Sequence, residues 1–221
     1  MNNSPDVQTP ILIRKYKPDD RQEVRRIVYE TSFLEKAELF FREKEILADS
    51  LTLYFTDYEP ESSFVACSDG KVVGYLIGVK DTRRMNSTLL SKVYPKIFLK
   101  ALKHGIFFKK EHRGFFYNFF KALLAGEFSV PSFDKEFPAA FHINIDKQFR
   151  GRGLGEKLIN SFLEYLKENG ITAVHLSTMS EESKEFFIKM KFKVLHQSSR
   201  TYLRYRLGHD FLVYTLGRKI D

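Results

Sequence analysis

The alternation of apolar and polar residues predicts a strand, a turn and a helix in succession between Phe141 and Gly170. Phe141 begins a two-residue alternation that continues through Ile145, the period of a strand whose two faces meet different surroundings. From Leu154 onwards, apolar residues recur at intervals of three and four. They form one stripe along a helix, which comprises Leu158, Ile159, Phe162, Leu163 and Leu166. Asn169 and Gly170 then end the predicted helix.

The residues before this segment also follow regular periods. Residues 11–16 are apolar enough for a strand, and Pro18 followed by two aspartates marks the start of a helix. A second helical pattern covers residues 36–52, and a polar, aromatic connector follows at residues 54–62. Asp69-Gly70 separates two apolar runs, at residues 63–68 and 71–80, and predicts a β-hairpin.

The residues after Gly170 predict a strand at 173–177, a helix at 181–191 and the start of a further strand at 192. Between the hairpin and the strand at Phe141 lies a long insert, residues 82–137. Two helical stripes are predicted there, at residues 89–101 and 115–124, with a break between them at residues 112–114. The simplest arrangement is two helices packed over the edge of the sheet.

Composition sets broad limits on these 221 residues. The hydrophobic content of 43% is ample for a core, and no apolar run reaches the roughly 18 residues that a membrane span needs. The first ten residues resemble a loose tail and lack the basic and apolar segments of a secretory signal. Cys67 is the only cysteine, so no intramolecular disulfide can form, which suits a reducing cytoplasm. We interpret Cys67 as a small core residue.

The turn between the predicted strand and helix is rich in glycine, at Gly151, Gly153 and Gly155. Residues without Cβ let backbone N–H groups approach an anion closely, and a helix N-terminus adds further donors. A phosphate or pyrophosphate is therefore the expected ligand, with Arg150 or Arg152 as counter-charge. The P-loop pattern is absent, and the glycine spacing differs from the dinucleotide fingerprint. The alternative is a turn whose glycines only permit close packing of the helix.

The pattern that fits is Arg-x-x-Gly-x-Gly, which starts at Arg150. Directly after a strand and at the start of an amphipathic helix, it resembles the acetyl-CoA motif of the GNAT acyltransferase superfamily. The resemblance extends over the predicted order of elements on both sides. It implies an α/β fold with a mixed sheet of about seven strands flanked by helices. The helical insert between the third and fourth strands is an addition that the minimal plan of the superfamily does not require. Residues 1–221 would form a single domain. More narrowly, residues 54–66 and 137–146 are similar to bacterial relatives of the acetyltransferase-like domain of O-GlcNAcase.

The resemblance also implies which residues contact the cosubstrate acetyl-CoA. Backbone N–H groups of the strand at Ile143 or Ile145 would hold the thioester oxygen, and the glycine turn would hold the pyrophosphate. Ser180 stands where many members have an asparagine that contacts the cofactor. The full expected set is Ile143, Asn144, Ile145, Arg150, Gly151, Arg152, Gly153, Leu154, Gly155 and Ser180. No metal site is expected.

Catalytic residues are less well defined. Many GNAT enzymes use a tyrosine as the acid that protonates the leaving thiolate, and Phe187 stands at that position here. Acetyl transfer to an amine also needs a base. Two candidates are Glu136, before the cofactor strand, and His142, whose unperturbed pKa of about 6.5 suits proton transfer near neutrality. His175 is either a partner of His142 or structural. Tyr58, Glu59 and Glu61 lie near the expected acceptor side, and a solvated loop explains these residues equally well.

We therefore predict a cytoplasmic acetyl-CoA-dependent N-acetyltransferase, with a non-catalytic CoA-binding or interaction module of the same fold as the alternative. The acceptor would be an amine on a small molecule or a peptide. The insert carries 11 Lys or Arg against four Asp or Glu, and ten of the 22 phenylalanines. This composition favours a substrate-covering lid or a homodimer contact over association with a membrane surface, and membrane association over nucleic acid.

Overall fold

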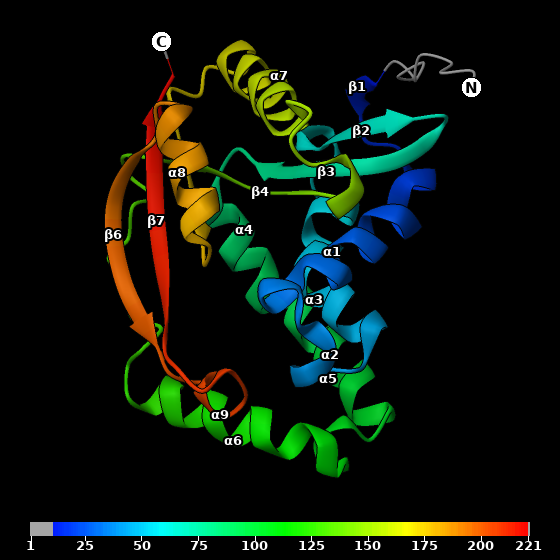
Figure 1. The fold of residues 1–221 in the computed structure, drawn as a ribbon, viewed down its shortest axis with the longest axis vertical. Coiled ribbons are helices and arrows are strands. Elements are labelled where there is room, and N and C mark those ends of the chain that lie inside the picture. Colours follow the sequence, from blue (N-terminus) through cyan, green and yellow to red (C-terminus); the bar gives the residue numbers. More distant parts are fainter. Residues whose placement is uncertain (1–10, 221) are drawn as a thin grey trace, which may run out of the picture.

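The computed structural model describes residues 11–220, so the tail expected at residues 1–10 lies outside the described part. One seven-stranded sheet runs through the protein in the order β1-β2-β3-β4-β5-β7-β6 (Figure 1). All neighbouring strands are antiparallel except β4 and β5, which are parallel. The strands are β1 (Leu12–Lys15), β2 (Phe64–Ser68), β3 (Lys71–Val79), β4 (Ala139–Ile145), β5 (Ala173–Thr178), β6 (Lys193–Arg200) and β7 (Phe211–Lys219). The predicted mixed sheet is confirmed.

Helices cover both faces of this sheet (Figure 1). On one face α7 (Leu154–Glu168) and α8 (Glu181–Lys189) bury their apolar stripes against alternate residues of β2 to β5. On the other face α1 (Arg21–Glu35) packs through Val24, Ile27 and Val28 against the opposite set of strand residues, and buried Cys67 belongs to this core. The period of two in the strands and of three to four in the helices is thus what assigns each residue to a layer.

The segment after α1 departs from the predicted helix at residues 36–52. It contains a short α2 (Ala37–Phe40) and then α3 (Lys44–Asp57), which extends into the predicted connector. Three consecutive non-glycine residues at the end of α1 have left-handed φ angles: Phe33 at 50°, Leu34 at 57° and Glu35 at 64°. Each such residue costs on the order of 1 kcal/mol, so packing around this turn must hold it in place.

The insert between β3 and β4 is helical, as predicted. It contains α4 (Thr82–Thr88), a π-helical turn (Leu89–Val93), α5 (Tyr94–Lys103) and α6 (Lys110–Leu124). The predicted break at residues 112–114 is wrong, because α6 runs through it and the chain turns at His104 and Gly105 instead. Gly105 has a φ of 63°, which suits glycine. Gly114 is a residue of helix α6, and its lack of a Cβ leaves room for the ring of Tyr205.

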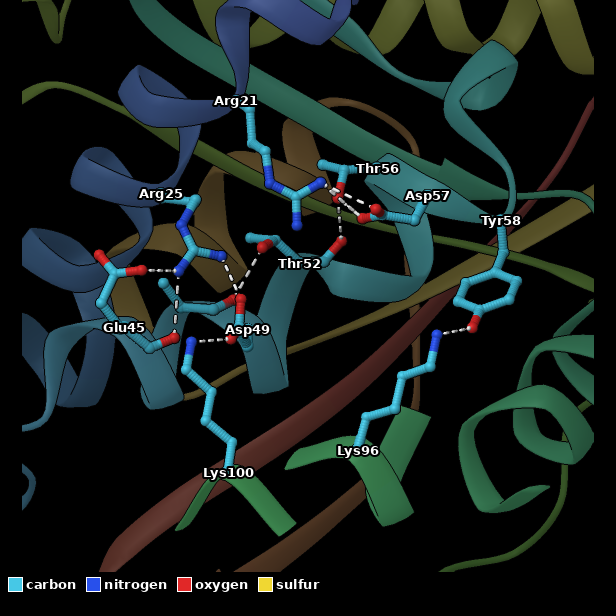
Figure 2. A network of polar contacts seen from close by, with 11 residues as sticks. Arg21, Arg25, Glu45, Asp49, Thr52, Thr56, Asp57, Tyr58, Lys96 and Lys100 are labelled. Atoms are coloured by element: carbon cyan, nitrogen blue, oxygen red, sulfur yellow. Dashed lines mark hydrogen bonds and ion pairs between the residues drawn. The ribbon is translucent and has the colours of Figure 1, made fainter. Parts of the chain in front are cut away.

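The insert packs against helix α3 and the β6–β7 connection, and not over the sheet edge as expected. Lys100 of α5 pairs with Asp49 of α3 at 2.5 Å, within the polar network of Figure 2. At the other end, the rings of Phe115 and Phe119 of α6 lie 6.3 and 6.0 Å from the ring of Tyr202. Both helices therefore lie at one end of the molecule, with α6 along its lower border in Figure 1.

Candidate active site

Strands β4 and β5 pair over only two residues, Ala139 with Val174 and Ala140 with His175. The rest of β4 pairs with β3 alone. Asp146 N–H donates to the Val73 carbonyl of β3 at 2.9 Å, and peptide groups alternate in direction along a strand. The N–H groups of Ile143 and Ile145 therefore point to the β5 side, beyond the end of the β4–β5 ladder. This splayed edge offers two backbone donors to a ligand.

The glycine turn lies directly after this edge. Gly151 has a φ of 74° and Gly153 a φ of 73°, and Gly153 is the N-cap of α7. A Cβ built on either glycine meets no atom within 4 Å, so the backbone there faces open space. The helical hydrogen bonds of α7 begin with Lys157 N–H to the Gly153 carbonyl at 3.2 Å. The amides before Lys157 precede any helical acceptor, so they are available to an anion.

Gly155 has a different role from the other two glycines. Its Cβ would lie 3.1 Å from Cζ of Phe186, in helix α8. Gly155 therefore permits close packing between α7 and α8, which is the alternative interpretation of the glycine pattern. The sequence motif combines two backbone requirements, a left-handed turn and a close helix contact.

The two arginines of the motif differ in their surroundings. Arg150 forms an ion pair with Glu35 and donates from Nε to the Ile145 carbonyl at 3.2 Å. Its guanidinium therefore ties the end of β4 to the left-handed turn after α1. Arg152 is exposed, and its guanidinium lies 5.1 Å from the ring centre of Phe149. Arg152 is thus the motif cation better placed to meet an incoming anion.

His142 points to the α1 face of β4 and contacts two polar neighbours. Its Nδ1 lies 3.1 Å from the Tyr75 hydroxyl, and its Nε2 lies 3.3 Å from Nδ2 of Asn144. Asn144 Nδ2 also donates to the Tyr75 oxygen at 2.8 Å. Because an amide NH₂ only donates, this arrangement assigns the lone pair to Nε2 and the hydrogen to Nδ1.

Burial changes the acid–base properties of this group. The pKa of His142 falls to about 4, because burial disfavours the cationic form. The expectation that His142 titrates near neutrality is therefore wrong. Its ring is only partly accessible to solvent, and at pH 7 it is neutral. Burial likewise raises the pKa of Tyr75, whose side chain is fully buried.

Comparison with known proteins connects this geometry to a family. A sequence model of the Acetyltransferase (GNAT) family matches residues 29–192, about three quarters of the chain. The chain belongs to the GNAT acetyltransferase family. It is an acyltransferase, with the mixed sheet that the resemblance implied. A search of curated protein sequences gives no match to this acetyltransferase.

Solved structures show the same fold. SsHAT superposes with a TM-score of 0.71 and 25% identity, over 96% of this chain and 98% of that chain. The polyamine N-acetyltransferase of Drosophila melanogaster has a TM-score of 0.57 and 15% identity, over 95% and 100% of the two chains. The structure of yncA from Salmonella typhimurium, solved with its cofactor acetyl-CoA, has a TM-score of 0.58 and 12% identity, over 96% of this chain and 94% of that chain.

Two positions that the family resemblance singled out follow β5 in the chain. Ser180 follows β5 and caps α8, since its Oγ accepts from Ser183 N–H at 3.2 Å. Phe187 of α8 is buried in the core, with its ring 6.2 Å from that of Phe141 and 5.7 Å from that of Phe192. The Phe187 position of this acetyltransferase therefore serves packing, and a phenylalanine cannot donate a proton.

Glu136 lies away from the glycine turn. It precedes β4 at the end where β4 and β5 remain paired, and its side chain is 63% exposed, 3.6 Å from Lys219. The structure does not bring Glu136 together with the other predicted site residues. His175 is not a partner of His142 either, because its Nδ1 lies 2.8 Å from the Phe137 carbonyl.

The residues expected on the acceptor side are engaged in structural contacts. Glu59 is buried and accepts from Tyr54, Ser62 and the Lys80 amide. Tyr58 accepts from Lys96 Nζ at 3.1 Å (Figure 2). These contacts hold the start of β2 and the insert in place.

A pocket of about 610 Å³ lies among α1, α2 and the start of α3. It contains no residue of β4 or β5, so it is distinct from the splayed edge. It adjoins the motif through two side chains: Glu35 pairs with Arg150, and Arg26 contacts Asp146 Oδ2 at 3.1 Å. The acidic side chains that line it are Glu30, Glu35, Glu38 and Glu45.

One cluster of the described residues has metal-ligating side chains, Glu43, Glu111 and His112. The two ring nitrogens of buried His112 have no hydrogen-bond partner in the described structure. However, Lys109 pairs with the Glu43 carboxylate, and Arg42 and Arg206 line the adjoining cavity of about 70 Å³. This positive charge opposes a divalent cation, so we assign no metal to the cluster.

Three residues that contact the predicted site were not indicated by any sequence pattern. They are Tyr75, Arg26 and Glu35. Tyr75 faces Asn144 across the β3–β4 ladder, and the alternation along β3 marks it only as a core residue. Glu35 and Arg26 come from α1, more than 110 residues before the motif. No local pattern signals such a contact, because it depends on how α1 packs across the sheet.

Proposed function

We propose that this acetyltransferase moves the acetyl group of acetyl-CoA to the amine of a small molecule or peptide. The observation that carries the proposal is the continuity of the splayed β4 edge with the left-handed glycine turn. We further propose that residues 1–221 form one domain that acts in the cytoplasm.

The proposed binding mode uses backbone donors at two places. The pyrophosphate would lie on amides between Gly151 and Gly155, with Arg152 as counter-charge. The thioester oxygen would accept from the N–H of Ile143 or Ile145, and these fixed dipoles would stabilise the negative charge that develops there. Asn144 and Leu154 contribute backbone to the same path, and Ser180 borders it from the β5 side. Acetyl-CoA would supply an acetyl group activated as a thioester.

Proton removal from the amine is the harder step, because an alkylammonium has a pKa of about 10.4. We propose His142 rather than Glu136 as the acceptor of this proton. His142 lies on the cofactor strand and keeps a lone pair at pH 7, whereas Glu136 pairs with Lys219 at the far end of the strand. A pKa of about 4 makes His142 a weak base, so we expect His142→Ala to lower turnover by only about tenfold.

The acceptor would be cationic before it reacts. Four carboxylates line the pocket beside the motif together with four cations, Arg25, Arg26, Lys36 and Lys44, so the lining has no excess of negative charge. Among the structural neighbours, one is a polyamine N-acetyltransferase and another an agmatine N-acetyltransferase. These two neighbours support a small polyamine-like amine over an aminoglycoside, a peptide N-terminus, a lysine side chain or an amino sugar. Phe187 in place of tyrosine is what favours the rival, a binding module without catalysis.

Two glycines that flank helix α7 give a matched test. Gly153 and Gly170 have φ angles of 73° and 72°, and a Cβ at either position meets nothing within 4 Å. Valine at each position should therefore cost similar stability, but only Gly153 lies at the proposed phosphate site. Calorimetry with acetyl-CoA should show a loss of affinity of about tenfold or more for Gly153→Val, and affinity near wild type for Gly170→Val.

Equal affinity of wild type and Gly153→Val would refute the binding mode. Thermal melts of both variants show whether the fold is retained, and the Gly153→Ala and Gly170→Ala pair repeats the comparison with less strain. Transfer to a panel of polyamines, tested separately with wild type, decides between enzyme and binding module. Tight binding of acetyl-CoA without transfer to any amine would favour the module.

A further inference from the structure

Large apolar side chains are exposed over the insert to an unusual degree. Of the 17 exposed large hydrophobic residues in the described chain, 11 lie between residues 82 and 137. Phe108 is 79% exposed, Tyr117 70% and Leu124 89%. An exposed apolar patch of this kind marks an interaction surface, because leaving it in water is costly.

On α5 and the π-helical turn before it, one exposed side is apolar, and two of the three lysines of α5 contact the body. Leu90, Tyr94, Phe98 and Leu102 recur at intervals of four, and all are exposed. By contrast, Lys96 and Lys100 contact Tyr58 and Asp49 of the body (Figure 2). The usual arrangement of a surface helix, apolar inside and charged outside, is thus partly reversed.

On α6 the outward side mixes cations with large apolar residues. Its inner side, with His112, Phe115 and Phe119, packs on Phe41 and Tyr202. Residues at the complementary spacing share the outer side, and all are exposed: Lys110, Arg113, Tyr117, Phe120, Lys121 and Leu124. Glu111 is the one carboxylate of α6, and it turns toward His112. The outer side of α6 is therefore basic and apolar without an acidic residue.

The two helices form one continuous surface. The Phe98 ring of α5 lies 5.6 Å from Phe107, and Phe107 lies 5.1 Å from Phe116 of α6. In Figure 1 this end of the molecule is opposite helix α7. We call the exposed residues of α5 and α6, with Phe108 between them, the insert face.

We propose that the insert face binds the surface of an anionic lipid bilayer. Aromatic and leucine side chains would enter the interfacial region, while Lys110, Arg113 and Lys121 pair with lipid phosphates. No helix of the described residues has the length and apolarity to span a bilayer, so the mode of binding is peripheral. Docking by this end leaves the glycine turn near α7 open to water and to its anionic ligand.

Charge and side-chain type distinguish a lipid surface from two other partners, a second copy of the chain and nucleic acid. A symmetric dimer through the insert face would place its cations against identical cations, with no carboxylate on α6's outer side to neutralise them. Nucleic acid would satisfy the charge, and bases could stack on the aromatic rings. It would not cover the exposed leucines at positions 90, 99, 102, 123 and 124, which have no flat ring for a base. A lipid surface satisfies both the charge and the aliphatic side chains.

The test uses the full chain and vesicle co-sedimentation. Wild type should bind vesicles with about 30% phosphatidylserine, fail to bind pure phosphatidylcholine, and dissociate as salt rises from about 50 to about 500 mM. Neutralising three cations (K110Q/R113Q/K121Q) should weaken partitioning by about 100-fold, at about fivefold lost per residue. The apolar variant F120S/L124S should lose about tenfold or more.

A matched control replaces three exposed lysines outside the insert, in K71Q/K189Q/K193Q, and should bind within about twofold of wild type. All substituted side chains are exposed, and melting curves establish that each variant is folded. No binding to anionic vesicles, or equal loss in the control variant, would overturn the proposal. The proposal would also be overturned if light scattering showed that the wild type is a dimer and that F120S/L124S is a monomer. Tighter binding to a single-stranded oligonucleotide than to the vesicles would overturn it as well.

Discussion

Glu35 forms an ion pair with Arg150, and this pair joins the left-handed turn after α1 to the first residue of the acetyltransferase motif. Lys147 also approaches Glu35 at 3.5 Å. The hydrogen bond from Arg150 and the two positive charges lower the pKa of the Glu35 carboxyl, so it is ionised at neutral pH. A negative charge thus lies beside the turn where we propose that a pyrophosphate binds.

Glu35→Gln should strengthen binding of acetyl-CoA. Removal of the carboxylate frees Arg150 and removes repulsion of the phosphates, and we expect about a threefold gain in affinity at low salt. Calorimetry at two salt concentrations measures this gain, which should shrink at the higher one. Glu38→Gln changes an exposed carboxylate of the same segment, whose nearest cation is Lys44, and should have no such effect. Weaker binding of acetyl-CoA by Glu35→Gln would contradict this prediction. It would show that the contact of Glu35 with Arg150 supports the binding site more than the negative charge of Glu35 opposes the ligand.

Phe187→Tyr should destabilise the protein without increasing turnover. The Phe187 ring is buried between Phe141 and Phe192, so a tyrosine hydroxyl would lose its water there. We expect a loss of about 1–3 kcal/mol in the free energy of unfolding. Urea unfolding and steady-state kinetics provide the two measurements, with Phe108→Tyr at an exposed position as the control. Higher turnover at unchanged stability would instead restore an acid role to this position.

Two Arg–Asp pairs between α1 and α3 predict different energetic costs (Figure 2). Asp49 is almost buried and contacts both Arg25 and Lys100, whereas the pair of Arg21 and Asp57 is about one third exposed. Asp49→Asn leaves Glu45 as the one remaining carboxylate partner of the buried Arg25 guanidinium. This substitution should lower the free energy of unfolding by about 3 kcal/mol. Asp57→Asn should cost less than about 1 kcal/mol. Similar costs in urea unfolding would contradict this difference in burial.

The free energy of unfolding should decrease as the pH is lowered, because His142 titrates. Its pKa is about 4 in the folded protein and about 6.5 when unfolded, so the unfolded state binds more protons between these values. The stabilisation is complete above about pH 6.5 and declines by roughly 3 kcal/mol as the pH falls to about 4.

His142→Asn removes this titration and should flatten the profile measured by urea unfolding at several pH values. Burial also lowers the pKa of His112, which leaves a residual slope of the same sign in the variant. Carboxyl groups whose pKa is lowered in the folded protein, among them Asp20, Glu35, Glu43 and Asp49, add a slope of the same sign below about pH 5. The two profiles are therefore compared between about pH 5 and 6.5. Parallel profiles for wild type and His142→Asn would contradict the assigned pKa.

The sequence alone determined the local elements and the motif. The two-residue alternation at Phe141 and the apolar stripe from Leu154 depend on nearest neighbours in the chain, and β4 and α7 begin and end within about two residues of the prediction. The hairpin at Asp69-Gly70 is equally local, because both residues adopt the left-handed φ that the turn requires. Family membership followed from the order of these elements.

The tertiary structure decided what surrounds each of these residues. The composition could not show that burial lowers the pKa of His142, that Arg150 pairs with Glu35, or that Glu136 lies at the far end of β4. For the insert, periodicity found one stripe at residues 89–101 and one at residues 115–124, but it could not show which residues of the second stripe pack on Phe41 and Tyr202 and which face solvent. Phe115 and Phe119 pack there, whereas Phe120 and Leu124 are exposed. A helical pattern records which residues share a side, whereas burial, pKa and pairing depend on distant segments that fold against that side.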